Sequence, residues 1–479
     1  MLFLLAFRHL FVRKARAIVL LLGYALGVGV MIVLLSVGEA MLEQSRDVAL
    51  VGGGELTVLP QGIDIEAMRT GGVSGMFFTI DRARFLTRQL IGGPRQASHV
   101  AAVSPVIENK LLYFRRGNHL LTVRAGGEIP SRASAVGAGL KLRAGAWQDS
   151  PDDSAYVAPT SGQLFDELDH FHLPVNPDSS WGEWHYFNLV VAPDEWWYFT
   201  YLIGGRVGAG RWGGQVLVTH RTPAGRYERF TQSAPSERTA FDTTRADLTI
   251  GESTVRQRAG SYQLHALARG ATGTVTIDVR LVPTPQRFFP PVKLQEGEYL
   301  SGYVVPALTA TANGTICSRD RCTPIHDVPA YHDHNWGVWR DVTWDWGAAR
   351  GASVSLLYGG VHTPDTVLTN GAPPFFVALI DSLGVRQILR AREIRYEGRQ
   401  PASGAGGTAP DRFTFAATRD ADTLRVRVHV EDALATVMGT GGFQRNFLQM
   451  RGHFVAEGTV GGRMVSDSGS GFFETYVRP

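Results

Sequence analysis

Cysteine is almost missing from this chain, whose 479 residues include two, Cys317 and Cys322. A lone C-x₄-C pair can close a short hairpin loop, but without a second pair it makes a poor zinc site. If this part of the chain is exported, the pair meets the oxidising conditions in which disulfides persist. The two cysteines therefore predict one disulfide, conditional on export, and no cysteine-based metal centre.

Three other absences limit the possible functions and the possible fold class. The P-loop pattern G-x-x-x-x-G-K-[ST] does not occur, so the chain carries no P-loop ATPase of its own. The basic residues are scattered and the net charge is +3, which is not the signature of a nucleic-acid-binding protein. Helical periodicity is nearly absent beyond residue 160, whereas 55 glycines and 24 prolines favour the many turns of antiparallel β-structure.

One apolar run alone is long enough to cross a bilayer as a helix, namely Ala17–Gly38, which contains no charge. Four basic residues precede it: Arg8, Arg13, Lys14 and Arg16. The positive-inside rule then places the N-terminus in the cytoplasm and the rest of the chain outside. A cleaved signal peptide is the alternative, but the run exceeds the roughly 7–15 residues of a signal core and no clear A-x-A site follows. We expect an uncleaved single-pass anchor.

The first 160 residues resemble part of a known transporter family. "LAFRHLFVRKARAIVLLLGYALGVGVMIVLLSVGEAM" resembles the first membrane helix of macrolide-export-type ABC transporter permeases, and "VSPVI…LLTVRAGG…LRAGAW" is similar to their extracytoplasmic domain. Those permeases have three further membrane helices that this chain lacks, so it cannot form their pore alone. The resemblance implies an interfacial and transmembrane helix over residues 1–48 and an α+β extracytoplasmic segment over 49–160. It also implies a location in the bacterial inner membrane and contact with ABC transporter subunits.

The body beyond residue 160 is rich in aromatic strands. All ten tryptophans lie between Trp147 and Trp346, and this shift in composition marks a domain boundary. "EWHYFNLVV" from Glu183 and "EWWYFTYLI" from Glu195 are joined by "APDE", which predicts a hairpin. Alternating segments continue at intervals of about 8–12 residues, as in a barrel or sandwich. The length fits two all-β units, over residues 161–300 and 301–479, each able to enclose one small ligand.

Six blocks of this body resemble one enzyme family. "HFHLP", "WHYFNLV", "WWYFTYLIGG", "GRWGGQVLVTHR", "AYHDHNWG" and "GFFETYV" are similar to blocks of the carotenoid 1,2-hydratases, also called hydroxyneurosporene synthases. The resemblance covers about residues 165–479 and implies a tandem lipocalin-like fold related to tocopherol cyclases. The expected fold class is therefore mainly β, with two consecutive lipocalin-like antiparallel barrels after the membrane helix and the α+β segment. The implied activity is hydration or cyclisation of an isoprenoid or carotenoid-type lipid.

The block "YHDHNWG" carries the candidate chemistry. Strand alternation puts Tyr331, Asp333 and Asn335 on one face. His332, His334 and Trp336 then lie on the other face. An enzyme that hydrates an isolated alkene must protonate carbon, and burial can keep a carboxyl group protonated near neutral pH. We predict Asp333 as the acid and His332 or His334 as the group that restores its proton, and the family resemblance implies the same three residues.

The remaining candidate residues are predicted to bind the substrate. Indole faces stabilise a carbocation by about 0.5–2 kcal/mol each and also solvate an apolar chain. The predicted tryptophans for this role are Trp184, Trp196, Trp197, Trp336 and Trp339. His185 and Glu183 from the hairpin, with Tyr331 and Asn335, complete the predicted substrate-binding set. The scheme needs no metal and no organic cofactor.

Three alternatives compete with these predictions. Asp333 could serve only to tie down a loop by accepting backbone N–H groups. His332 and His334 could bind a metal with His326 or His185, although no carboxylate or cysteine is obviously in phase. The whole body could be a non-catalytic lipocalin-like module that collects an apolar ligand for a transporter. A carrier needs few polar groups in its cavity, so the string "HDHNW" favours the enzyme.

Overall fold

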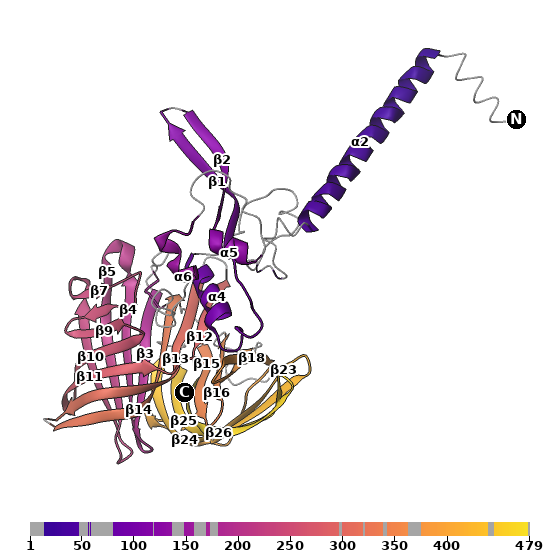
Figure 1. Ribbon diagram of the computed structural model, residues 1–479. Helices are drawn as coiled ribbons and strands as arrows, with labels where there is room; N and C mark the ends of the chain where they lie inside the picture. The colour runs from indigo at the N-terminus through magenta and orange to yellow at the C-terminus, as the bar shows by residue number, and fades with distance from the viewer. Residues whose placement is uncertain are drawn as a thin grey trace. The chain divides into compact units, whose positions relative to one another are not determined.

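The computed structural model describes residues 14–46, 56, 58, 80–117, 119–136, 148–157, 169–172, 181–296, 299–319, 321–338, 343–362, 375–438 and 445–477. The chain divides into two compact units. The first comprises Met1–Ile91 with His99–Pro159, and the second comprises Gly92–Ser98 with Thr160–Pro479. Each unit is described separately below (Figure 1).

The first unit contains the short helices and one isolated hairpin. Strands β1 (Val106–Arg116) and β2 (His119–Glu128) pair antiparallel. Helix α4 (Ile80–Gly92) ends at a Gly-Gly pair, which is a normal helix stop. The described residues of this unit also form α5 (Pro130–Ala135), a 3₁₀ turn (Pro151–Asp153) and α6 (Ser154–Val157).

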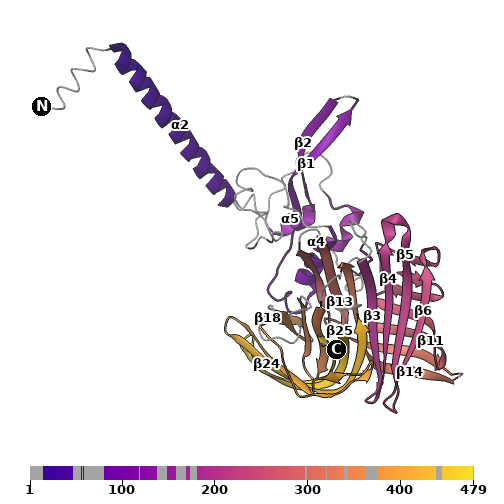
Figure 2. The same cartoon turned by 180° about the vertical axis from the view of Figure 1, so that it is seen from behind.

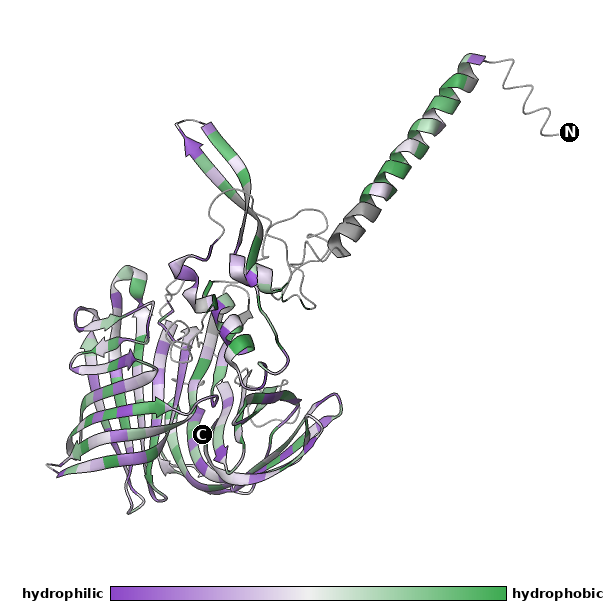
Figure 3. Ribbon diagram, in the orientation of Figure 1, coloured by the Kyte–Doolittle hydropathy of each residue, from purple (hydrophilic) through white to green (hydrophobic). Residues whose placement is uncertain are grey.

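The apolar run near the N-terminus lies in α2 (Lys14–Arg46), a helix of 33 residues. The large side chains that the structure describes between Ile18 and Val37 are exposed, and most of the coloured part of the helix is green in Figure 3. Among the residues that the structure describes, however, no helix is both long and apolar enough to cross a membrane. The membrane span expected over Ala17–Gly38 is therefore not supported.

The first barrel is a closed ring of antiparallel strands. In order around the ring these are β14 (Arg321–Val338), β3 (Trp181–Ala192), β4 (Glu195–Arg206), β5 (Arg211–Arg221), β6 (Tyr227–Pro235), β10 (Ser261–Gly270), β11 (Gly273–Pro283) and β13 (Tyr299–Ser318). The pairing of β13 with β14 closes the ring. The predicted aromatic hairpin is β3 and β4, with Phe187 opposite Phe199. Four strands extend the sheet outside the ring: β7 (Thr239–Phe241), β8 (Leu248–Ile250), β9 (Ser253–Arg258) and β12 (Phe289–Glu296).

The second barrel is built the same way. Its ring runs through β15 (Thr343–Gly351), β16 (Ser355–His362), β17 (Phe375–Asp381), β18 (Gly384–Ala391), β23 (Arg412–Arg419), β24 (Asp422–Met438), β25 (Arg445–Val460) and β26 (Arg463–Val477). The pairing of β15 with β26 closes it. Four short strands lie beside the ring: β19 (Arg395–Glu397), β20 (Gln400–Pro401), β21 (Ser403–Gly404) and β22 (Thr408–Ala409). Figure 2 shows this ring from behind.

The two barrels do not divide at residues 300 and 301, where the sequence suggested a boundary. The first barrel continues through β13 and β14 to Val338. The length of the body suggested two units of similar size, but β13 returns to pair with β11, and β14 then pairs with β3. The "YHDHNWG" block consequently belongs to the first barrel. At the turn between β13 and β14, Cys317 and Cys322 are joined by a disulfide.

Alternation along each strand separates the apolar side chains inside a barrel from those on its outer face. The interior of the first barrel contains Phe187, Phe199 and Tyr201, and that of the second contains Tyr358, Phe413 and Phe473. A third cluster, which includes Tyr303 and Tyr331 of the first barrel and Leu357 of the second, lies between the outer faces of the two barrels. Apolar and polar colours alternate along the strands in Figure 3, as expected for strands with two different faces.

Candidate active site

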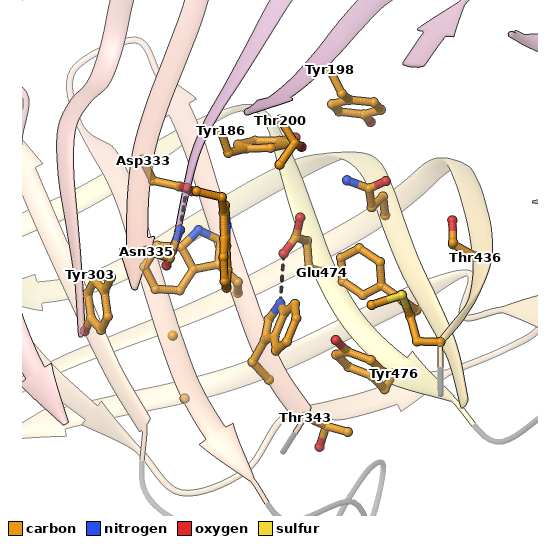
Figure 4. Close-up of a pocket in the computed structure, with 18 of the residues that line it drawn as sticks. Tyr186, Tyr198, Thr200, Tyr303, Asp333, Asn335, Thr343, Thr436, Glu474 and Tyr476 are labelled. Carbon is orange, nitrogen blue, oxygen red and sulfur yellow. Dashed lines mark hydrogen bonds between the residues drawn. The ribbon is translucent and has the colours of Figure 1, made fainter. Parts of the chain in front are cut away.

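A large cavity lies between the outer faces of the two barrels. Its volume is about 1610 Å³, which exceeds the roughly 300–1,000 Å³ of most small-molecule sites. Strands β3 to β6 and β12 to β14 contribute to one wall, and strands of the second barrel form the other. Many of the lining side chains are aromatic, among them Trp184, Tyr186, Tyr198, Tyr303, Trp344, Trp346, Phe376, Phe447 and Tyr476 (Figure 4). Four arginines also line the cavity: Arg229, Arg390, Arg419 and Arg445. The cavity therefore suits a large, mostly apolar ligand.

Asp333 of β14 is one of two carboxyl groups among the described residues that line this cavity. The Tyr331 hydroxyl donates to Asp333 Oδ2 at 2.7 Å, and Asn335 Nδ2 donates to Oδ1 at 2.7 Å. Trp346 Nε1 in turn donates to the Tyr331 hydroxyl at 3.1 Å. Burial is the main cause that raises the pKa of Asp333 to about 8, and the negative charge of Glu474 adds to it against the hydrogen bonds. Asp333 is thus oriented on two sides and keeps its proton at neutral pH.

Glu474 of β26 is the second carboxyl group, and sequence reasoning missed it. Figure 4 shows it in the same cavity as Asp333, on a strand of the other barrel. Trp344 Nε1 donates to Glu474 Oε2 at 2.9 Å. Burial raises the pKa of Glu474 to about 7, against the lowering effect of the hydrogen bonds from Trp344 and Gln449. Near neutral pH this group therefore exists in both protonation states.

Two tyrosines add hydroxyl groups to the first-barrel wall. Tyr186 and Tyr198 face the cavity from neighbouring strands, and their rings stack at 6.2 Å. Burial raises the pKa of both phenols, so both stay neutral. Together with Thr200 they place hydroxyl groups beside the aromatic side chains of this wall. Such groups can orient a hydroxyl or a water molecule beside the ligand.

His332 and His334 do not share this cavity with Asp333. Strand alternation, as the sequence predicts, turns both histidines into the interior of the first barrel. There His334 Nδ1 lies 2.7 Å from Asp169 Oδ1, and His334 Nε2 lies 2.8 Å from Glu183 Oε1. His332 Nε2 lies 3.3 Å from Asp169 Oδ2. Because the two histidines and Asp333 project from opposite faces of β14, the predicted direct relay from histidine to Asp333 is wrong.

The other predicted residues are distributed over three places. Trp184 and Asn335 line the cavity with Asp333. His185, Glu183 and Trp336 lie inside the first barrel, where the Trp336 ring stacks on His172 at 3.6 Å.

Two tryptophans pack away from the cavity. Trp197 stacks on His220 at 3.7 Å. Trp196 lies under the guanidinium groups of Arg221 and Arg451. Trp339 lies outside the described residues.

The polar cluster inside the first barrel also contains Asp169, which is not among the site residues predicted from the sequence. Its carboxylate also accepts a hydrogen bond from the Tyr262 hydroxyl at 2.5 Å. The string "DHFHLP" held the only signal, because it clusters ionisable residues beside an aromatic one. Among the described residues, two groups could hold a metal ion: Asp169, His185 and His334, and His172, Glu183 and His334.

No protein-family model and no curated protein matches the chain. Solved structures that resemble it include an AttH-like protein from Nitrosomonas europaea, with 13% identity, covering 62% of this chain and 92% of that one, at a TM-score of 0.44. Kievitone hydratase from Nectria haematococca shows 14% identity, covers 66% and 98%, and has a TM-score of 0.43. CghA shows 10% identity, covers 65% and 96%, and has a TM-score of 0.39. These similarities are too low to support an argument about function.

Proposed function

We propose that the protein adds water, or an internal hydroxyl group, across a carbon–carbon double bond of a hydrophobic isoprenoid or carotenoid-type molecule. One observation carries the proposal: Asp333, a buried and doubly oriented carboxylic acid, faces a wide cavity lined by aromatic rings. Protonation of an alkene needs an acid held protonated beside the double bond, and an apolar site supplies that condition. The reaction class is that of a lyase of the hydratase type.

The chemical steps follow from the groups in the cavity. The Asp333 O–H bond breaks and a C–H bond forms, leaving a tertiary carbocation on the substrate. Faces of Trp184 and Trp346 offer about 0.5–2 kcal/mol each of cation stabilisation when a cation lies over them. Water, or a hydroxyl of the substrate itself, then forms the C–O bond. Glu474 is suited to take the proton that this oxygen releases, since its pKa of about 7 leaves a large ionised fraction at neutral pH.

Isotope labelling tests this proposal. The purified chain is incubated with an acyclic carotenoid that ends in isopropylidene groups, in water enriched in ¹⁸O. We expect the product to contain one ¹⁸O for each hydrated double bond, because water supplies the new hydroxyl group. Asp333→Asn should abolish incorporation, whereas Trp197→Phe, a change on the interior side of β4, should leave it. Incorporation at the wild-type rate by Asp333→Asn would exclude Asp333 as the acid.

A second function is favoured by the lining of the same cavity. Most of its side chains are apolar or aromatic, which also suits a non-catalytic protein that binds a hydrophobic ligand. In that case tryptophan fluorescence should report binding of the carotenoid without any product, and Asp333→Asn should bind with unchanged affinity. Turnover in the labelling experiment separates the enzyme from the carrier.

We also propose that the second unit lies outside the cytoplasm. The Cys317–Cys322 disulfide supports this location, because such bonds persist mainly in oxidising compartments. Attachment to the bacterial inner membrane and contact with ABC transporter subunits stay predictions from the first 160 residues. Activity of a C-terminal reporter that works only in the cytoplasm would contradict the proposed location.

A further inference from the structure

The interior of the first barrel holds a second concentration of reactive side chains, separate from the cavity. Asp169, Glu183, His185, His332 and His334 are all buried there. His172 joins them from the edge, with 20% of its side chain exposed. Barrel interiors are normally filled by apolar side chains. Buried carboxylates are costly unless they are paired or coordinate a metal, so this cluster needs a physical explanation.

Three donor atoms converge on one point of the cluster. His172 Nδ1 lies 3.1 Å from Glu183 Oε1, and His334 Nε2 lies 2.8 Å from the same oxygen. A tetrahedral zinc ion with bonds of about 2.0–2.1 Å requires donor atoms about 3.3 Å apart. Glu183 Oε1 would therefore move by only a few tenths of an ångström from each histidine nitrogen to accept an ion, and all three donor atoms lie within 4.8 Å of one another. Two histidines and one glutamate are also an established ligand set for zinc.

The groups behind these donors are arranged as in known metal sites. His334 directs its other nitrogen, Nδ1, at Asp169 Oδ1 at 2.7 Å. A carboxylate in that place fixes the imidazole so that Nε2 is available to a metal. Asp169 is itself held by the Tyr262 hydroxyl. Glu183 is oriented by the backbone N–H of His172, which lies 2.8 Å from Oε1 and 2.9 Å from Oε2.

The alternative group of Asp169, His185 and His334 is less suitable. The rings of His185 and His334 are stacked, with centroids 4.1 Å apart and planes inclined by 28°. Lone pairs of nearly parallel imidazoles cannot converge on one ion. The rings of His172 and His334 are instead inclined by 57°. The geometry thus selects His172, and the exposed part of that residue offers the ion a route from solvent.

The buried carboxylates give a second reason for a cation. The two nitrogens of His334 lie within hydrogen-bond distance of two different carboxylates, those of Asp169 and Glu183. A divalent ion bound between Glu183 and His334 would place a positive charge beside both of these buried groups.

We propose that His172, Glu183 and His334 bind one divalent transition-metal ion of the zinc class, with Asp169 positioning His334. The ion ties residues 169–172, which lie outside any strand, to β3 and β14 of the barrel. The site lies on the opposite face of β14 from Asp333 and is independent of the proposed hydratase activity. In the segment "DHFH", His172 would bind the metal ion and Asp169 would position His334.

Metal stoichiometry tests the proposal. The full chain, purified without a polyhistidine tag and stripped with a chelator, is dialysed against Zn²⁺ or Co²⁺ and its metal content measured. We expect one equivalent per chain, visible Co²⁺ absorption bands of a nitrogen- and oxygen-ligated ion, and a higher melting temperature with Zn²⁺. His172→Gln and Glu183→Gln should each remove this equivalent, and Asp169→Asn should weaken binding by about 10–100-fold.

Two matched controls make the result decisive. His170→Gln changes a nearby histidine, whose Nδ1 lies by the Phe171 carbonyl oxygen. Glu195→Gln changes a carboxylate of β4 that pairs with His220 of β5. Both should keep one equivalent. Because His172 is partly exposed, His172→Gln is expected to fold, and circular dichroism verifies its fold. This variant keeps the proposal testable if Glu183→Gln does not fold. A wild-type chain that binds no ion, or a folded His172→Gln that binds as tightly as wild type, would overturn the proposal.

Discussion

The side chain of Asp333 illustrates how one residue can be costly to stability and necessary for chemistry. We expect Asp333→Asn to lower turnover by at least about 10²-fold, since general-acid catalysis contributes that much. Its folded-state pKa of about 8 lies above the ordinary 3.8, so burial of this carboxyl opposes folding at neutral pH. The midpoint of urea unfolding at pH 8 should therefore stay unchanged or rise. A residue that only anchored the strand would give the reverse, with activity per folded molecule retained and a lower midpoint.

Glu474 gives a prediction about pH. Its folded-state pKa of about 7 lies above the ordinary 4.5 because of burial. Between these values the unfolded chain releases a proton that the folded chain keeps, so stability falls as pH rises from about 4.5 to 7. Glu474→Gln should remove this part of the slope. Unfolding midpoints at pH 5 and pH 8 measure it, with Glu457→Gln as the control because Glu457 is an exposed partner of Arg427. Equal slopes for wild type and Glu474→Gln would show that the carboxyl is not held protonated.

At the scale of elements, the β13–β14 hairpin carries both the disulfide and the acid. Cys317 and Cys322 are five positions apart, so their bond closes a very short loop. Chain-entropy reasoning gives about 2 kcal/mol for such a loop. Replacing both cysteines by serine should lower the free energy of unfolding by about that amount, measured by urea denaturation. Two free thiols in protein taken from its native compartment, detected by mass spectrometry, would contradict the bond.

The same strand shows how far sequence reasoning reaches. Local alternation correctly separated Asp333 from His332 and His334, because side-chain direction in a strand depends only on neighbouring residues. It could not place β14 in the first barrel, since that depends on its pairing with β3, far away in the sequence. Glu474 and Asp169 were missed for the same reason. Asp169 contacts His334 across 165 positions, and no spacing rule covers such a distance.

At the scale of the whole second unit, Asp432 joins the two barrels. It accepts hydrogen bonds from Arg221 Nε at 3.1 Å and from the Tyr227 hydroxyl at 2.6 Å, both in the first barrel. Asp432→Ala should cost about 1–3 kcal/mol, because it leaves partly buried donors unpaired. It should also weaken ligand binding by loosening the walls of the cavity. Glu397→Ala, which removes an exposed ion pair with Arg412, is the control and should cost at most about 1 kcal/mol. Equal losses of unfolding free energy in the two variants would contradict a special role for Asp432.

The position of the cavity outside both barrels has a consequence for how readily the protein can acquire new substrates. Its walls include outward-facing, half-buried side chains such as Thr200, Leu202 and Leu217, which neither barrel interior requires for its packing. Substitutions that leave a core intact usually alter stability by about 0.5 kcal/mol or less. A library randomised at these three positions should therefore yield mostly folded proteins with altered ligand preference. The fold separates the residues that select a ligand from those that keep the chain folded, which makes this site a practical starting point for directed evolution.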